Sequence, residues 1–517
     1  LVFHEKIIMP ANQLPSQHYF SAILITSLIA SVAFFDFAIF IYLSDLLRQI
    51  FFGGTEYTWL SRLQLFGLFS AGYIARPLGG LMIGYYGDTK GRRPALFISL
   101  LGITIFTLFI GLLPQYSQIG FIAPIIFIVA RVIQSLAIGG IMPSVWVYVT
   151  EHLPTRHIGV GCGAILSGCV LSLIFLILLM NWLDDTLTWA QMMSFGWRIP
   201  FICGGLLSVI LILISYKHLQ ETPIFLEAHS ERSFRPKHES MLSNMSLSTL
   251  TNSQIKQLDH LPAIEFQLSE DTKMPDHSIS PSSMTPPPKI NEIDQRTVTT
   301  AMRLTSKLTS FARSSISFFQ IICNKNMLIS IIPAIMLISI MVSLLIFTPI
   351  LLVDLIDGSF RISETVLWFG NVLAILFMAI GCLIFGILVD RLNPGIVLTF
   401  GSLFLAMQVA LFFNHLRNGG EYGLIFFALF GFASGIIGAI PSVVVRLFPA
   451  KIRLTSVSII YNIIIALIGG LLPFVLHSAS AHIAFAPMIF IVSLSLLTMF
   501  ISFYIYYIPR TDLDMNR

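Results

Sequence analysis

The stretch that decides the fold reads Arg76-Pro77-Leu78-Gly79-Gly80, followed by Gly84-Tyr85-Tyr86-Gly87-Asp88-Thr89-Lys90-Gly91-Arg92-Arg93. It places small residues, one acid and a basic cluster between two long apolar segments. A weaker echo, Gly386-Ile387-Leu388-Val389-Asp390-Arg391, follows about 300 residues later, again between apolar segments. A charged turn that recurs in both halves of an apolar chain predicts an internally duplicated architecture.

The composition is typical of a chain that crosses a membrane many times. Of the 517 residues, 56% are hydrophobic and 11% are charged, whereas soluble domains carry about 25% charged residues. A helix needs roughly 20 apolar residues to cross the hydrocarbon core. We therefore predict an all-α membrane protein with twelve transmembrane helices in two six-helix pseudo-repeat bundles, at approximately 20–44, 63–87, 94–113, 121–150, 158–181, 197–216, 327–353, 365–389, 395–414, 422–447, 455–477 and 483–508.

The remaining segments are predicted to be tails and a linker. The predicted regions are a tail at 1–19, a first bundle at 20–216, a linker at 217–325, a second bundle at 326–508 and a tail at 509–517. The linker is rich in Ser, Thr and Pro and cannot bury enough apolar surface to fold, so we expect it to be largely disordered. Within it, apolar and basic residues at 302–322 fit an interfacial helix. The alternative for 302–322 is the amphipathic start of the seventh span.

Charge and motifs exclude several classes of function. Basic residues such as Lys90, Arg92 and Arg93 concentrate in the short loops on one side, which by the positive-inside rule predicts that both termini are cytoplasmic. This distribution argues against nucleic acid as a partner and leaves the lipid bilayer and a small-molecule substrate. No Cys-xx-Cys or His-Glu-xx-His pair suggests a metal, no P-loop suggests ATP, and no spacing suggests a catalytic triad. We expect no enzyme and no cofactor, with a proton gradient as the energy source.

Several motifs occur together in one order. They are Phe35-Asp36-Phe37, the segment from Arg76 to Arg93, Arg131-Val132-Ile133-Gln134, Glu151 with Pro154, Gly196 to Phe201, Glu221-Thr222-Pro223, and Phe448-Pro449 to Pro473-Phe474. Their order resembles that of the major facilitator superfamily. Within it, the chain is similar to the metabolite:proton symporters, which include bacterial proline/betaine, α-ketoglutarate, citrate and shikimate permeases. The resemblance implies a monomer in the bacterial inner membrane that takes up a small polar metabolite or osmolyte by proton symport and alternating access.

Three positions depart from that family's pattern. Ile141 stands where an acid usually follows the Gly-Gly pair, Ser135 where a Gly is usual, and Arg446 where an acid is usual. Two alternative functions stay open, and the departure at Ile141 favours the first. One is an exporter or an uncoupled facilitator of the same fold. The other is a sensor or scaffold that acts through the long cytoplasmic loop.

Ionisable residues inside predicted spans are costly and are therefore candidates for function. Asp36 and Arg131 fall at similar depths, so we predict a pair that a proton or an anionic substrate can break, with Gln134 beside Arg131. Arg131 favours an anionic or zwitterionic substrate. The alternative is a permanent ion pair that only fixes helix packing. Four further residues are candidates for lining a cavity, with ordinary packing as the alternative: Trp146, Tyr148, Tyr461 and Asn462.

The opening motif is predicted to act as a gate between the halves. Asp88 is expected to face the positive N-terminal end of a neighbouring helix, and Arg92 and Arg93 are expected to pair with acids such as Glu151 or Glu221. Such a cluster would stabilise an outward-open state. The alternative is that the basic residues only set the topology. The complete predicted gating set is Arg76, Gly84, Asp88, Gly91, Arg92, Arg93, Asp390 and Arg391.

Overall fold

The computed structural model describes residues 16–52, 58–227, 325–357, 360, 362–418 and 423–507. Within these ranges the regular structure is helical and contains no strand. The segment 302–322 and most of the linker lie outside the described residues.

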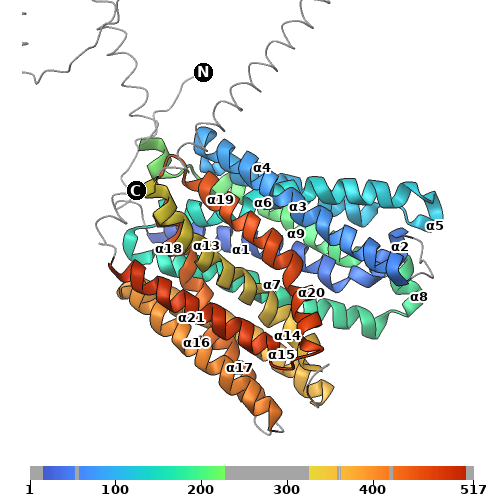
Figure 1. Cartoon of the computed structure of the whole chain (residues 1–517). Helices are drawn as coiled ribbons and strands as arrows, with labels where there is room; N and C mark the ends of the chain where they lie inside the picture. Colours follow the sequence, from blue (N-terminus) through green and yellow to red (C-terminus); the bar gives the residue numbers. More distant parts are fainter. Residues whose placement is uncertain are drawn as a thin grey trace, which may run out of the picture. The chain divides into compact units, whose positions relative to one another are not determined.

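The first half of the chain contributes six long helices, which are shown from blue to green in Figure 1. They are α1 (Ser16–Tyr42), α3 (Thr58–Lys90), α4 (Arg92–Leu112), α6 (Ile122–His152), α7 (Ile158–Thr186) and α9 (Arg198–His218). Three short helices lie in the connections: α2 (Ser44–Phe52), α5 (Tyr116–Ile119) and α8 (Trp189–Gln191).

The second half contributes six more long helical segments, three of which consist of two helices joined by short elements. They are α13 with α14 (Lys325–Ile346, Leu352–Asp357), α15 (Glu364–Arg391), α16 (Pro394–Arg417), α17 with α18 (Gly423–Ser434, Ile440–Val444), α19 with α20 (Arg453–Ile464, Gly470–Ser480) and α21 (Ala486–Tyr507). Wide helical turns at Phe347–Leu351 and Ile465–Gly469 join α13 to α14 and α19 to α20.

These twelve segments coincide with the twelve predicted spans. Among the described residues, 11 helices are long and apolar enough to cross a membrane by length and composition. The twelfth segment is α3, whose 33 residues reach about 50 Å at 1.5 Å per residue. A continuous helix satisfies its own backbone hydrogen bonds, which is what a segment in lipid requires.

The predicted charged turn is much shorter than its sequence suggests. The segment from Gly84 to Lys90 is helical, α4 begins at Arg92, and Gly91 alone separates the two helices. Gly91 has φ of 122°, a conformation that a residue without Cβ adopts at little cost. The structure therefore places Asp88 in the last turn of a helix instead of in a loop.

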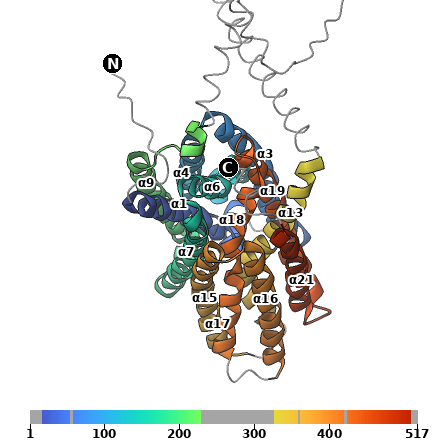
Figure 2. The ribbon, with the colours of Figure 1, turned by 90° about the vertical axis from the view of Figure 1, so that its left-hand side faces the viewer.

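The two halves meet along two helix pairs, α3 with α19 and α7 with α15, which lie side by side in Figure 2. Glycine permits both contacts. A Cβ on Gly84 would lie 2.8 Å from the Thr455 Cα, and a Cβ on Gly159 would lie 2.3 Å from the Gly386 carbonyl oxygen. The close approach brings the last turn of one helix against the first turn of its partner in both pairs. We call this end of the helices the Asp88 end and the opposite end, where α1 finishes, the Tyr42 end.

Candidate transport site and gate

A buried polar chain links three helices of the first half. The Thr107 hydroxyl of α4 donates to the Asp36 carboxylate of α1 at 2.5 Å, and the Gln134 amide of α6 donates to both Asp36 oxygens at 3.0 and 3.1 Å. Asp36 is 1% exposed. A buried carboxylate needs hydrogen bonds or a counter-charge, and this one obtains its hydrogen bonds from helices far apart in the sequence.

Arg131 reaches Asp36 only through Gln134. The Arg131 guanidinium donates to the Gln134 amide oxygen at 2.8 Å and lies over the Phe40 ring, 3.3 Å from its centroid. The predicted direct Asp36–Arg131 ion pair is therefore wrong in this structure, because among the described contacts the Gln134 side chain occupies the space between them. Gln134 holds the acid on one side and the base on the other.

A small cavity of about 10 Å³ lies beside these buried polar contacts, and its lining includes two arginines, Arg76 and Arg131. The Arg76 guanidinium lies 4.8 Å from the Phe37 ring centroid and 5.5 Å from the Tyr73 ring centroid. Within the described part of the chain, no hydrogen bond or ion pair is made by Arg76, which is 3% exposed. Two buried cations thus stand near one buried carboxylate, so the site carries an excess of positive charge.

At the Asp88 end, the Asp88 carboxylate binds the N-terminus of α19. It accepts hydrogen bonds from the backbone N–H groups of Leu454 and Thr455 at 3.2 and 2.8 Å, and from the Thr455 hydroxyl at 2.6 Å. The expected contact of Asp88 with a helix N-terminus is confirmed. An anion at this position is stabilised by the unpaired N–H groups and the helix dipole.

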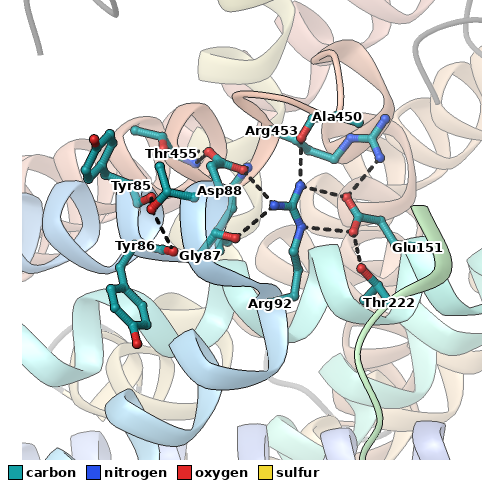
Figure 3. A network of polar contacts seen from close by, with 12 residues as sticks. Tyr85, Tyr86, Gly87, Asp88, Arg92, Glu151, Thr222, Ala450, Arg453 and Thr455 are labelled. Atoms are coloured by element: carbon teal, nitrogen blue, oxygen red, sulfur yellow. Dashed lines mark hydrogen bonds and ion pairs between the residues drawn. The ribbon is translucent and has the colours of Figure 1, made fainter. Parts of the chain in front are cut away.

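Arg92 lies at the centre of the buried contacts in Figure 3. Its guanidinium makes a bidentate pair with Glu151 at 2.9 and 3.1 Å, approaches Asp88 at 3.2 Å and donates to the Ala450 carbonyl at 2.7 Å. Arg453 pairs with Glu151 Oε1, an oxygen that Arg92 also contacts, at 3.2 Å. We call Asp88, Arg92, Glu151 and Arg453 the charged network. It alternates in sign, is almost fully buried and joins the two halves.

The segment that follows α9 closes over the charged network. The Thr222 hydroxyl donates to Glu151 at 2.8 Å, and the Phe225 ring lies 5.2 Å from the Arg92 guanidinium carbon. The Glu221 carboxylate accepts from the backbone N–H groups of Arg92 and Arg93 at the start of α4. Burial raises the pKa of Glu221 above its ordinary value, against the opposing effect of these N–H donors.

Arg93 and Tyr148 are also held at this end. The Arg93 guanidinium donates to the Tyr216 carbonyl at 2.9 Å, so its side chain does not pair with an acid in the described contacts. The Tyr148 hydroxyl donates to the Gln220 carbonyl at 2.7 Å. Tyr148 therefore lies against the segment after α9 and does not line a cavity among the described pockets, in contrast to the role considered for it.

The other cavity candidates are buried where the halves meet. Trp146 packs edge-to-face on Tyr461 with ring centroids 5.0 Å apart. The Asn462 amide donates to the Gly139 carbonyl at 2.7 Å. Trp146 and Asn462 are 0% exposed and Tyr461 is 4% exposed, so in this conformation they serve as contacts between α6 and α19.

The second half repeats the Asp88 contact at Asp390. Its carboxylate accepts from the backbone N–H groups of Gly159 and Val160, at 2.7 and 2.8 Å, at the start of α7. The neighbouring Arg391 is exposed. The two halves therefore each place an acid from the end of one helix on the N-terminus of a helix in the other half.

Thr107, Arg453 and Thr455 were not among the predicted site residues. Thr107 shares its apolar span with the hydroxyl residues Ser99 and Thr104, so the sequence alone does not single it out. Thr455 could have been found as a hydroxyl at the start of a helix that follows Phe448-Pro449. Among the described residues, no group of three or more His, Cys, Asp and Glu could hold a metal ion.

The chain belongs to the major facilitator superfamily, because the family model described as Major Facilitator Superfamily matches residues 25–473. It is a multi-pass membrane protein of a transporter family. It is 35% identical over 199 residues to a "Putative proline/betaine transporter" of Staphylococcus aureus (strain COL), covering 38% of this chain and 42% of that protein. It is 34% identical over 227 residues to the "Inner membrane metabolite transport protein YhjE" of Escherichia coli (strain K12), covering 43% of this chain and 49% of that protein.

The chain thus spans less than half the length of these curated relatives. A solved structure of the proton:xylose symporter XylE, bound to 6-bromo-6-deoxy-D-glucose, matches with a TM-score of 0.67 at 13% identity, over 96% of this chain and 97% of that one. This likeness extends over both halves and supports the fold, while the low identity carries no information on substrate.

Proposed function

We propose that this chain is a secondary active transporter that couples the movement of a small polar metabolite to protons by alternating access. The observation that carries the proposal is the buried Asp36, linked through Gln134 to Arg131 and near Arg76, for which the described residues provide no hydrogen bond or ion pair. Charges buried in a membrane protein are costly and tend to mark transport or proton pathways. The excess positive charge favours a substrate that carries a carboxylate.

A coupling step follows from these contacts. Protonation neutralises Asp36, which weakens its hold on the Gln134 amide and reduces the electrostatic stabilisation of Arg131. A substrate carboxylate then replaces the lost negative charge by binding to the arginines. Release of the proton restores the original contacts and favours release of the substrate. Asp36, Arg131 and Gln134 are the proposed coupling residues.

The charged network supports the alternating-access part of the proposal. It seals the halves at the Asp88 end, while a cavity of about 740 Å³ lies between the halves at the Tyr42 end. With both termini in the cytoplasm of a bacterium and the chain in the inner membrane, this conformation faces outward. Breaking the network would open the Asp88 end and let a monomer alternate between the two states.

The direct test is uptake into proteoliposomes with an acidic exterior, using labelled proline, betaine, α-ketoglutarate, citrate and shikimate. The wild type should accumulate one of these classes, faster with the pH gradient than without it. Asp36→Asn should keep exchange but lose the acceleration, whereas Asp45→Asn should behave like the wild type because Asp45 is 79% exposed in its side chain. Unchanged gradient dependence in Asp36→Asn would remove Asp36 from coupling.

Ile141 favours a second candidate function, an exporter or uncoupled facilitator of the same fold. Its side chain is 0% exposed in α6 and stands where the similar symporters usually have an acid, so one possible proton carrier is absent. Exchange that is equally fast with and without a pH gradient in the wild type would favour this candidate. The scaffold alternative depends on the linker, and deletion of residues 229–324 with retained transport would exclude it.

A further inference from the structure

The cavity at the Tyr42 end is built from both halves of the chain. In the first half it is lined by the ends of α1 and α7, and in the second half by α14 and the start of α15. At the Asp88 end, α7 and α15 touch through Gly159 and Gly386. The same two helices therefore enclose a tight contact at one end and a cavity at the other.

Two ladders of side chains line this cavity. On α15, Glu364, Trp368 and Asn371 are spaced by four and three residues, and on α7 Asn181 and Asp184 are spaced by three. Such spacings place side chains on one face of a helix. Asn371 lies two turns, about 10 Å, deeper than Glu364 at 1.5 Å per residue. Each ladder thus begins with a carboxylate at the end of its helix and continues with an amide further in.

The charge of the cavity has one sign. Three acids line it, Asp184, Asp354 and Glu364, and no Lys, Arg or His occurs among its described lining residues. A cleft lined by one sign of charge concentrates ions of the opposite sign. A metal ion is a poor match because the described acids form no group close enough to bind one. The electrostatic field of the cavity fits an organic cation better.

A buried acceptor within the cavity gives independent evidence for a ligand. The Asn371 side chain is 9% exposed, and its Oδ1 atom has no hydrogen-bond partner in the described contacts. Its Nδ2 atom donates to the Pro349 carbonyl at 3.3 Å, which fixes Oδ1 as the acceptor left over. A buried acceptor without a donor is destabilising, so a solute that brings an N–H group would be stabilised there. Trp368, one turn nearer the opening, also lines the cavity, and its buried Nε1 donor likewise has no partner among the described contacts.

We propose that this cavity is the first binding site of the substrate and that it selects solutes carrying a protonated amine. The N–H groups of the amine donate to Asn371, and its charge is balanced by Asp184 and Glu364. The inference rests on the proposed transport function and narrows its substrate class. Combined with the carboxylate expected at Arg76 and Arg131, it points to a zwitterion and away from di- and tricarboxylates.

The test is equilibrium binding to the purified full chain in detergent, measured as a thermal shift. The ligands are propylammonium, tetramethylammonium and propionate at matched ionic strength. The wild type should bind propylammonium more tightly than tetramethylammonium, which has no N–H, and should not bind propionate in the cavity. Asn371→Leu should weaken the binding of propylammonium about tenfold, because a hydrogen bond to a charged group is lost. It should leave the binding of tetramethylammonium unchanged.

Adjacent acids provide a matched pair of variants that are both at the exposed end of α7. Asp184 lines the cavity and Asp185 does not. Asp184→Asn should weaken the binding of propylammonium about threefold, as expected for a solvent-screened charge. Asp185→Asn should leave this binding unchanged. Equal effects of the two variants on propylammonium binding, or propionate binding that Asn371→Leu weakens as much as it weakens propylammonium binding, would overturn the proposal.

The binding test needs no membrane and no gradient, so its outcome is separate from that of the uptake test. Propylammonium binding that depends on Asn371 and Asp184, in a chain that shows no gradient-driven uptake, would support the amine site and reject proton symport. Gradient-driven uptake of a dicarboxylate, with no amine binding, would support symport and reject the amine site.

Discussion

Asp88 and Asp390 make the same contact in the two halves, yet their surroundings differ. Each carboxylate accepts two backbone N–H groups at the start of a helix from the other half. Around Asp88 lie Arg92 and the rest of the buried charged network, whereas the cations near Asp390 are Arg446 and His157, which are partly buried and exposed, respectively. Glycines allow close packing in both contacts, but among the described residues only the α3–α19 contact carries a buried charged network.

The two contacts differ because a few equivalent positions in the two halves carry different residues. The same spacing separates Gly159 from Leu454 and Glu151 from Arg446, so Arg446 stands in the second half where Glu151 stands in the first. Val160 likewise stands where Thr455 donates to Asp88. Salt-bridge networks can have two discrete arrangements, whereas closely packed backbones have few alternative positions. We therefore infer that α3–α19 opens as the gate and that α7–α15 acts as the pivot.

Glu151→Ala should have the largest effect. It leaves Arg92 and Arg453 buried without their shared partner, which costs about 3–5 kcal/mol when one side of a buried pair is removed. Arg446→Ala, the matching change in the other half, should cost far less because Arg446 is only partly buried. Thermal unfolding of both variants in detergent measures the difference, and similar losses would contradict the assignment of one charged and one packed contact.

Asp88→Asn should shift the conformational equilibrium towards opening at the Asp88 end. The change removes the charge that binds the α19 N-terminus and Arg92, and a partly buried charge at such a position contributes up to about 2 kcal/mol. We expect about a tenfold faster reaction of a cysteine introduced at Ser458 with a polar maleimide. Asp390→Asn provides the control, and a larger effect of Asp390→Asn would reverse the roles of gate and pivot.

Thr455→Val makes the α3–α19 contact resemble the α7–α15 contact. It removes one hydrogen bond to a buried carboxylate, which should lower the free energy of unfolding by about 1.5–3 kcal/mol. Part of that loss should also appear as faster labelling of the cysteine at Ser458. Val160→Thr tests the reverse change, and labelling that is unaffected by Thr455→Val would show that the hydroxyl has no part in the gate.

The smallest expected effect concerns Glu221 and pH. Burial raises the pKa of Glu221 in the folded state above its pKa in the unfolded chain. Glu221 therefore stabilises the folded state at a pH below its unfolded-state pKa, and this stabilisation is lost as the pH rises through its folded-state pKa. The melting temperature of the wild type relative to Glu221→Gln should therefore be higher at pH 4 than at pH 7. A difference that grows with rising pH would mean that the N–H donors of α4 outweigh burial.

The sequence predicted the fold well because apolar segments of sufficient length have few alternatives in a membrane. It also predicted the Asp88 and Glu151 contacts, since an acid and a basic cluster at helix ends have definite electrostatic partners. It could not reveal that Gln134 stands between Asp36 and Arg131, because depth in a span does not give the rotation of the helix. For the same reason it placed Tyr148 with the cavity candidates, although its hydroxyl lies against Gln220.

The most direct test of the gate and pivot measures two distances between spin labels in the same protein, with the native cysteines replaced by alanine. One pair, Lys90→Cys with Lys451→Cys, reports on the Asp88 end, and the other, Asp185→Cys with Ser363→Cys, reports on the Tyr42 end. In Asp88→Asn the first distance should lengthen and the second should shorten relative to the parent. Unchanged distances, or distances that lengthen at both ends, would contradict the account.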